Sequence, residues 1–392
     1  MLLLVYFITV LCFFFIVLNI YLNVFKIAFF GLFFVGDIVF TTSYNSLDYV
    51  IYTLTTLIPL LLVVAIFTLA ERRIMASIQR RKGPNVVGFF GFLQPFADGL
   101  KLILKEIVFP NKANKFIFVL GPSFVLFLSF IGWASMPFNL YSLSLTYSVL
   151  YILVVSSFGV YGILLSGWSS YSKYALLGAL RSVAQVVSYE ASIGLCLLVV
   201  VLFGGSLNLN KLIYIQMKTV WFVFPLFPLS IIFFISILAE TSRAPFDLTE
   251  AEAELVAGYN VEYSAIMFVA FFLGEYTNIL FMSGFFVCLF FGGSSFGLEF
   301  SVLSNTFVFL QGVFFSLKIV IIATLFIFVR ANLPRFRFDQ LMFVGWKVFL
   351  PITLAFILFF SSILYVVGGL EIAQVPHINS VFNYIELLSV KF

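Results

Sequence analysis

The chain contains nine runs of about 20 predominantly apolar residues, and these runs limit its possible folds more than any other feature. A transmembrane helix needs about 20 such residues. Of the 392 residues, 63% are hydrophobic and 10% are charged, whereas soluble proteins carry about 25% charged residues. We therefore predict an all-α, polytopic transmembrane helical bundle of about nine helices, at residues 2–25, 51–70, 116–136, 147–168, 184–204, 221–239, 263–291, 307–329 and 346–368.

One of these runs, 263–291, is longer than a single span requires. At a rise of about 1.5 Å per residue, its helix would exceed the hydrocarbon thickness of about 30 Å. We expect it to be tilted, bent or broken, near Gly274 or Gly284.

The basic residues predict the orientation of the spans. Four segments hold 16 of the 21 Lys and Arg residues, and nine of these lie in the first segment. All four fall on one side if the nine spans alternate, and the positive-inside rule assigns that side to the cytoplasm or an organelle matrix. The segments are 71–115, 169–183, 240–262 and 330–347.

Residues 93–109 form a short amphipathic segment that is too polar to span. Apolar residues recur at helical spacing, with polar residues on the other face and Pro110 as the predicted end. Such a helix lies in the membrane interface or against a partner. Two alternatives remain at this point: a plain interfacial anchor, or a helix that lines an opening for lipids.

The stretch from Ala239 to Ser264 concentrates acidic residues between two apolar runs. Pro245 prevents a helix from continuing into it, and Thr249-x-x-Glu252 or Asp247-x-x-Glu250 fits a capping box that starts a new helix. A solvated surface loop is the simpler interpretation, but the order of acids, proline and cap favours a functional loop. Its acids are Glu240, Asp247, Glu250, Glu252, Glu254 and Glu262, and Arg243 is its single base.

Two acids, Glu190 and Glu275, lie inside predicted spans. An ionisable group in hydrocarbon costs about 2.5–3.5 kcal/mol on insertion scales, so each acid requires a compensating role. Either it is held neutral for packing, or it belongs to a proton relay, which we favour. At helical spacing Glu190 lies off the face of Arg181 and Gln185, so its partner must come from another helix.

The residues that usually bind redox cofactors are sparse. Cys12, Cys196 and Cys288 are isolated in apolar runs, and His377 is the single histidine. The chain has no CxxC, GxGxxG or P-loop motif. We therefore expect no metal, haem or iron–sulfur cluster in this chain, and no nucleic acid among its partners.

Five long motifs identify a resemblance. Between Ile51 and Val367 the chain closely resembles the subunit 1 (H-type) family of respiratory complex I, the proton-pumping NADH:ubiquinone oxidoreductase. Residues 51–369 would be the family's membrane domain, 1–50 an added N-terminal extension with a probable extra helix, and 370–392 a C-terminal tail. The motifs are ERRIMASIQRRKGPNVVGFFGFLQPFADGLKLILKE (71–106), ALLGALRSVAQVVSYE (175–190), AETSRAPFDLTEAEAELVAGYNVEYS (239–264), GEYTN (274–278) and RANLPRFRFDQLM (330–342).

The resemblance implies a membrane subunit without a redox centre of its own. Such a subunit forms the membrane end of the tunnel for its substrate ubiquinone and the adjoining proton channel, and couples quinone reduction to proton translocation. Carried over by motif, the tunnel would use Arg72, Arg81, Phe96, Asp98, Phe271 and Phe272. The channel would use Glu190, Glu240, Asp247, Glu250, Glu252, Glu254 and Glu275, with Arg181, Arg243 and Arg335.

The resemblance also implies a setting, and other classes of protein remain as alternatives. The setting is the mitochondrial inner membrane, with membrane lipids, quinone-site subunits of the hydrophilic arm and neighbouring membrane-arm subunits as partners. A proton-coupled transporter would share the buried acids but should show an internal repeat, and this chain has none. A hydrogenase-type membrane subunit would share the acidic loop, and a passive anchor would need neither buried acid.

Overall fold

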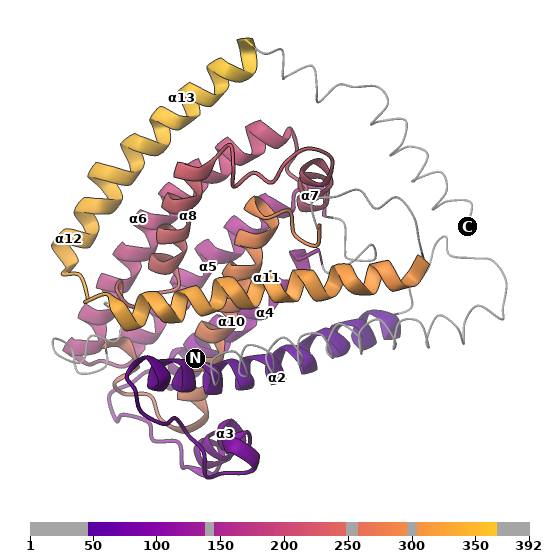
Figure 1. The fold of residues 1–392 in the computed structure, drawn as a ribbon. Helices are drawn as coiled ribbons and strands as arrows, with labels where there is room; N and C mark the ends of the chain where they lie inside the picture. Colours follow the sequence, from indigo (N-terminus) through magenta and orange to yellow (C-terminus); the bar gives the residue numbers. More distant parts are fainter. Residues whose placement is uncertain (1–45, 138–144, 248–257, 296–303, 367–392) are drawn as a thin grey trace.

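The structure is a computed structural model that describes residues 46–137, 145–247, 258–295 and 304–366. Within these ranges all regular secondary structure is helical, which confirms the predicted all-α bundle (Figure 1). The α-helices are α2 (Ser46–Ile78), α3 (Gln94–Leu104), α4 (Lys115–Gly132), α5 (Ser148–Ser169), α6 (Lys173–Gly204), α7 (Leu209–Lys218), α8 (Phe227–Glu240), α10 (Ala265–Phe290), α11 (Ser304–Asn332), α12 (Phe338–Phe343) and α13 (Leu350–Val366).

Six helical segments in the described ranges are long and apolar enough to cross a membrane. The predicted span 51–70 lies inside α2, whereas the span 2–25 lies outside the described residues. The six segments are Lys115–Ser135, Ser148–Ser169, Lys173–Gly204, Ala265–Phe290, Gln311–Asn332 and Phe338–Tyr365.

Helix α10 lies at the centre of the packing. It contacts α2, α3, α4 and α11, and every residue from 279 to 290 is buried. In Figure 1, α2 and α11 run side by side across the lower part of the view, and α13 lies at one edge. Helix α13 packs against α6, while α4, α5 and α6 pack in sequence order.

Helix α10 is continuous from Ala265 to Phe290, so of the three alternatives a break is wrong, and a tilt or a bend stays a prediction. Gly274 serves close packing instead, because a Cβ there would lie 3.1 Å from a side-chain carbon of Val125 in α4. The 26 residues correspond to about 39 Å of helix.

Three other predicted boundaries are corrected. The span 221–239 is shorter than expected, because 222–226 form turns and α8 has only 14 residues, or about 21 Å. The span 184–204 starts earlier, since the Ser172 hydroxyl accepts a hydrogen bond from the Ala175 N–H and caps α6 before Lys173. The amphipathic helix ends at Leu104 rather than at Pro110, because Lys105 adopts extended backbone angles.

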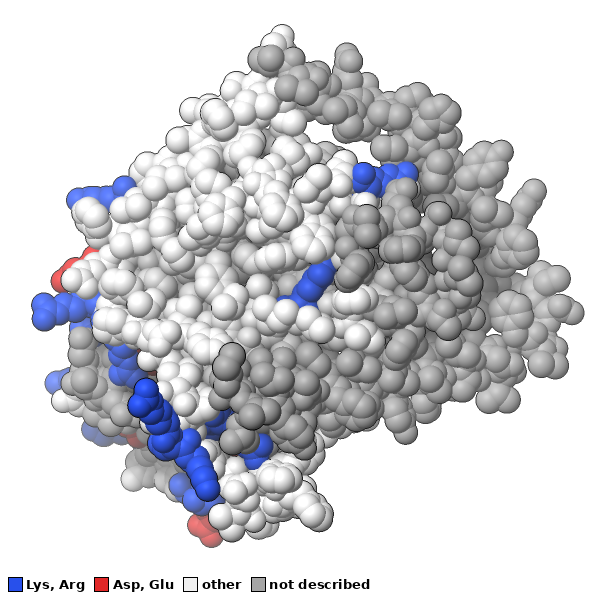
Figure 2. All heavy atoms as spheres, viewed as in Figure 1, with Lys and Arg blue, Asp and Glu red and all other residues white. Residues whose placement is uncertain are grey.

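The four basic segments meet at one end of the bundle. The Asn114 N–H bonds to the Ser169 carbonyl, and the Phe336 N–H bonds to the Pro245 carbonyl at 3.0 Å, which joins all four segments in two pairs. Figure 2 shows most of the visible Lys and Arg side chains gathered at the lower left, where Figure 1 places α3 and α12. Their shared side of the membrane stays a prediction.

Candidate functional site

The most extensive group of charged side chains among the described residues centres on Glu71, which follows the predicted span 51–70 directly. The Glu71 side chain is 8% exposed. It pairs with Arg330 of α11 and with Arg243, whose Nη1 lies 3.4 Å from Oε1, and it accepts a hydrogen bond of 2.6 Å from the Tyr276 hydroxyl of α10. We call these four residues the Glu71 cluster.

The electrostatics of the Glu71 cluster favour an ionised carboxylate. Burial alone would raise the pKa of Glu71. The Arg243 and Arg330 guanidinium groups and the Tyr276 hydroxyl outweigh this effect, so the pKa of Glu71 lies below its usual value. The Arg243 guanidinium also lies over the Tyr276 ring, 4.4 Å from its centroid.

Sequence reasoning did not identify Glu71, Arg330 or Tyr276 as site residues. Glu71 stood beside Arg72 and Arg73, where an acid at the end of an apolar run looks like part of a solvated basic turn. The available signal was its position as the first residue of the motif 71–106.

The predicted tunnel residues fall into separate places. Arg72 and Asp98 form an ion pair of 2.6 Å, with side chains 53% and 37% exposed, whereas Arg81 bonds to Gln79. Phe96 of α3 is exposed, and α3 contacts both α2 and α10. These residues therefore lie around the C-terminal end of α2.

The two predicted tunnel phenylalanines of α10 have different surroundings. Phe271 is fully buried and packs edge-on against the Tyr259 and Tyr263 rings at 5.1 and 5.0 Å. Phe272 is half-buried, and its ring lies 6.4 Å from that of Tyr276. Of the two, only Phe272 borders the Glu71 cluster.

Several predicted channel residues meet partners from distant parts of the chain. The Tyr259 hydroxyl donates a 2.7 Å hydrogen bond to Glu275. Glu240, at the end of α8, interacts electrostatically with Glu190 of α6. That Glu190 has a partner from another helix stays a prediction.

The described ends of the acidic stretch are packed against the bundle. Asp247 is buried and pairs with Arg335 at 3.3 Å. Gln185 of α6 donates hydrogen bonds to the Ala239 and Phe246 carbonyls at 2.7 and 2.8 Å. A fully solvated loop is therefore wrong for these ends, whereas Glu250, Glu252, Glu254 and both predicted capping boxes lie wholly or partly outside the described residues.

Arg181, also predicted for the channel, lies within α6, one turn before Gln185. It is half-buried. Its position brings it to the same end of the bundle as the acidic stretch.

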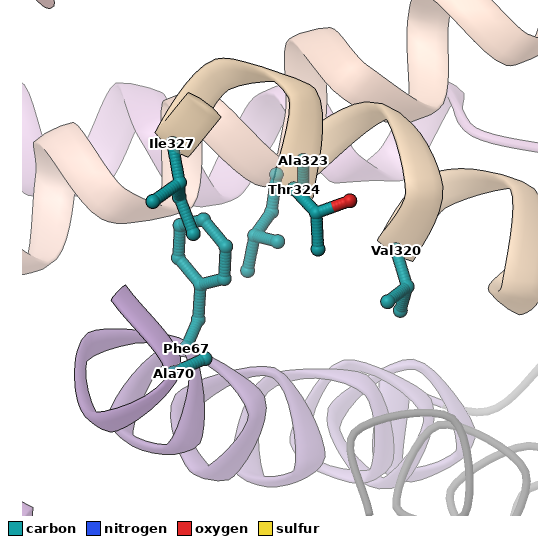
Figure 3. Close-up of a pocket in the computed structure, with 7 residues that line it drawn as sticks. Phe67, Ala70, Val320, Ala323, Thr324 and Ile327 are labelled. Atoms are coloured by element: carbon teal, nitrogen blue, oxygen red, sulfur yellow. The ribbon is translucent and has the colours of Figure 1, made fainter. Parts of the chain in front are cut away.

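A narrow crevice between α2 and α11 leads to the Glu71 cluster. Its apolar part is too small for a water molecule and is lined by Phe67, Ala70, Leu280, Val320, Ala323, Thr324 and Ile327 (Figure 3). A second narrow pocket shares Phe67 and Ile327 with it and reaches Glu71, Arg243 and Arg330. The cluster thus forms the polar end of an apolar helix interface.

No three His, Cys, Asp or Glu side chains in the described ranges lie close enough to hold a metal ion. Cys196 and Cys288 are buried free thiols, and Cys12 and His377 lie outside those ranges. The prediction that this chain carries no metal, haem or iron–sulfur cluster stays a prediction.

Comparisons with known proteins test the resemblance in the motifs. The sequence profile described as "NADH dehydrogenase" matches residues 51–361. The chain is 53% identical to NADH-ubiquinone oxidoreductase chain 1 of Cyanidium caldarium, over 80% of this chain and 91% of that protein. It is 54% identical to the Arabidopsis thaliana protein of the same name, over 79% and 94% of the two chains.

A bacterial relative shows the same similarity. The H-type subunit of the Paramagnetospirillum magneticum NADH-quinone oxidoreductase is 51% identical over 82% of this chain and 93% of its own length. The match therefore extends across nearly the whole of each relative and confirms the resemblance. On this evidence the chain belongs to the NADH dehydrogenase family.

Proposed function

We propose that this chain is the membrane subunit of an NADH:ubiquinone oxidoreductase that forms the membrane end of the quinone tunnel and the adjoining proton channel. The names of its relatives support the enzyme complex. One observation carries the coupling between tunnel and channel. Glu275 and Tyr276, consecutive residues of α10, link the tunnel to the channel. Tyr276 donates a hydrogen bond to Glu71 of the tunnel side, and Glu275 of the channel side accepts one from Tyr259.

The tunnel side combines an apolar entrance with a charged inner end. Apolar side chains of α3 are exposed, including Phe96, Leu100 and Ile103, and suit an isoprenoid tail. The Glu71 cluster supplies two guanidinium groups, each with five N–H donors, which can hydrogen-bond to the carbonyl oxygens of a quinone headgroup. Phe272 lies between these two regions along α10.

The channel side is built from carboxyl groups at helix interfaces. Glu275 has a phenol partner, while Glu190 and Glu240 are close enough to influence each other's charge. Interacting carboxyl groups titrate as a coupled set. A change of charge at the Glu71 cluster therefore reaches Glu275 through α10, and the acids of 239–264 provide the route onward to Glu240 and Glu190.

The remaining parts of the proposal concern the setting. We place the chain in the mitochondrial inner membrane, beside the quinone-site subunits of the hydrophilic arm and neighbouring membrane-arm subunits. The extension 1–50 and the tail 370–392 contact partners specific to this lineage. Purification in mild detergent and identification of the co-purifying subunits distinguish this complex from a transporter or a hydrogenase-type complex.

A photoreactive ubiquinone tests the tunnel directly. We expect crosslinks within 71–106 or 263–280, because α3, the end of α2 and the first half of α10 adjoin each other. An excess of unlabelled ubiquinone should abolish them. Crosslinks confined to 137–146 would contradict the proposal.

A further inference from the structure

The C-terminal end of α10 is buried, which creates a demand for hydrogen-bond donors. The last four carbonyl groups of an α-helix have no partner within the helix. Here residues 287–290 are all buried. Water is absent from an apolar environment, so these groups need partners from the protein itself.

Donors from neighbouring segments bond to each of these four carbonyl groups. The Phe291 and Gly293 N–H groups bond to the Val287 carbonyl, each at 3.0 Å. Gln216 of α7 donates to the Cys288 and Leu289 carbonyls at 3.1 and 3.0 Å. The Val223 N–H completes the set by bonding to the Phe290 carbonyl at 3.0 Å.

The chain then turns so that its next carbonyl groups converge on Lys318 of α11. Gly292 and Gly293 have φ angles of +65° and +54°, which glycine adopts at little cost. The Lys318 ammonium donates to three carbonyl groups, those of Phe291 at 2.8 Å, Gly293 at 3.0 Å and Ser295 at 2.6 Å. An ammonium group has three donors, so all three are used.

The charge of Lys318 also suits this place. The C-terminal end of a helix carries partial negative charge, which a cation stabilises. The Lys318 Nζ atom lies 4.7 Å from the centroid of the Trp221 ring, an additional cation–π contact. Cations in membrane helices pair with backbone carbonyl groups because an isolated charge is costly there.

We propose that Lys318 is a positioning residue, whose ammonium group fixes the C-terminal end of α10 against α11 and so sets the places of Glu275 and Tyr276. The same two helices meet again at the Glu71 cluster, where Tyr276 of α10 and Arg330 of α11 both bind Glu71. Helices α10 and α11 are thus joined at two points. This inference rests on the function proposed above.

The test compares three variants in the assembled oxidoreductase. Lys318→Met removes the charge and the donors, Lys318→Arg keeps both, and Lys218→Met is the matched control. Lys218 of α7 is exposed and lies over the Tyr214 ring. The readouts are hydrogen exchange of residues 285–295 and ubiquinone turnover, normalised to assembled complex by NADH:ferricyanide activity.

For Lys318→Met we expect exchange at 291–295 to rise about tenfold and ubiquinone turnover to fall about fivefold at unchanged NADH:ferricyanide activity. Lys318→Arg should recover most of both losses, and Lys218→Met should match the wild type. Unchanged exchange in Lys318→Met overturns the inference, as does raised exchange with normal turnover. If Lys318→Met does not assemble, Lys318→Gln replaces it under the same criteria.

Failure of the proposed function would look different. Glu275→Gln and Tyr276→Phe should lower turnover while leaving exchange at 291–295 unchanged, because neither residue contacts that segment. If both variants turn over normally, the roles of Glu275 and Tyr276 are wrong, whatever the exchange of Lys318→Met shows.

Discussion

The two junctions between α10 and α11 use different chemistry. At the Glu71 cluster, two guanidinium groups and a phenol meet around one ionised carboxylate. At Lys318, a single cation meets three backbone carbonyl groups, which do not titrate. The comparison suggests a division of roles, in which one junction responds to local charge and the other holds the helices in register.

The largest effect is expected for Glu71→Gln. It removes the negative charge that the half-buried Arg243 and Arg330 share, and removing one partner of a buried ion pair costs about 3–5 kcal/mol. We expect a large fall in the midpoint of thermal unfolding and loss of most ubiquinone turnover. Glu106→Gln, which changes an exposed acid, is the control. Normal turnover in Glu71→Gln would remove the distinction between the two junctions.

The junctions should also differ in their response to acid. The pKa of Glu71 is lower in the folded protein than its ordinary value of 4.5. Its contribution to stability is therefore complete above that value and is lost as pH falls through the lowered folded pKa. Thermal unfolding of the wild type and Glu71→Gln as a function of pH would measure this. If the difference in unfolding midpoint between the wild type and Glu71→Gln already shrinks between pH 8 and about 6, the lowered pKa is contradicted.

A smaller effect is expected when both junctions are altered. If Glu71 and Lys318 act on one position of α10, the losses of turnover in Glu71→Gln and Lys318→Met should not add. We expect a coupling energy of about 1 kcal/mol in a double-mutant cycle. Additivity within about 0.3 kcal/mol would show that the junctions act independently.

The smallest effect is expected outside both junctions, at the Arg72–Asp98 pair. Both side chains are more than a third exposed, and exposed ion pairs contribute about 0–1 kcal/mol. Arg72→Gln should therefore leave thermal unfolding nearly unchanged. Equal losses of stability in Arg72→Gln and Glu71→Gln would contradict the argument that burial makes the Glu71 ion pairs the stronger ones.

Local pattern predicted much of the fold because the features concerned lie close together in the sequence. The apolar runs 116–136 and 147–168 predicted α4 and α5 to within two residues at each end, if the short η2 turn (Trp133–Ser135) that follows α4 directly is counted with it. The boundaries of α6 and α8 were wrong where a cap or a turn, rather than hydrophobicity, ends the helix. A break in α10 was wrong because Gly274 allows close packing against α4 within a continuous helix.

The class of fold, the family and the presence of acids inside spans follow from the sequence alone, since runs and motifs express these directly. The contacts of the site depend on tertiary packing. Glu71 meets Arg243, Tyr276 and Arg330 across 172, 205 and 259 residues, and Lys318 meets carbonyl groups 23 to 27 residues earlier. Backbone carbonyl groups carry no residue identity, and distant side chains have no periodic relation, so only the packing of α2, α10 and α11 brings these groups together.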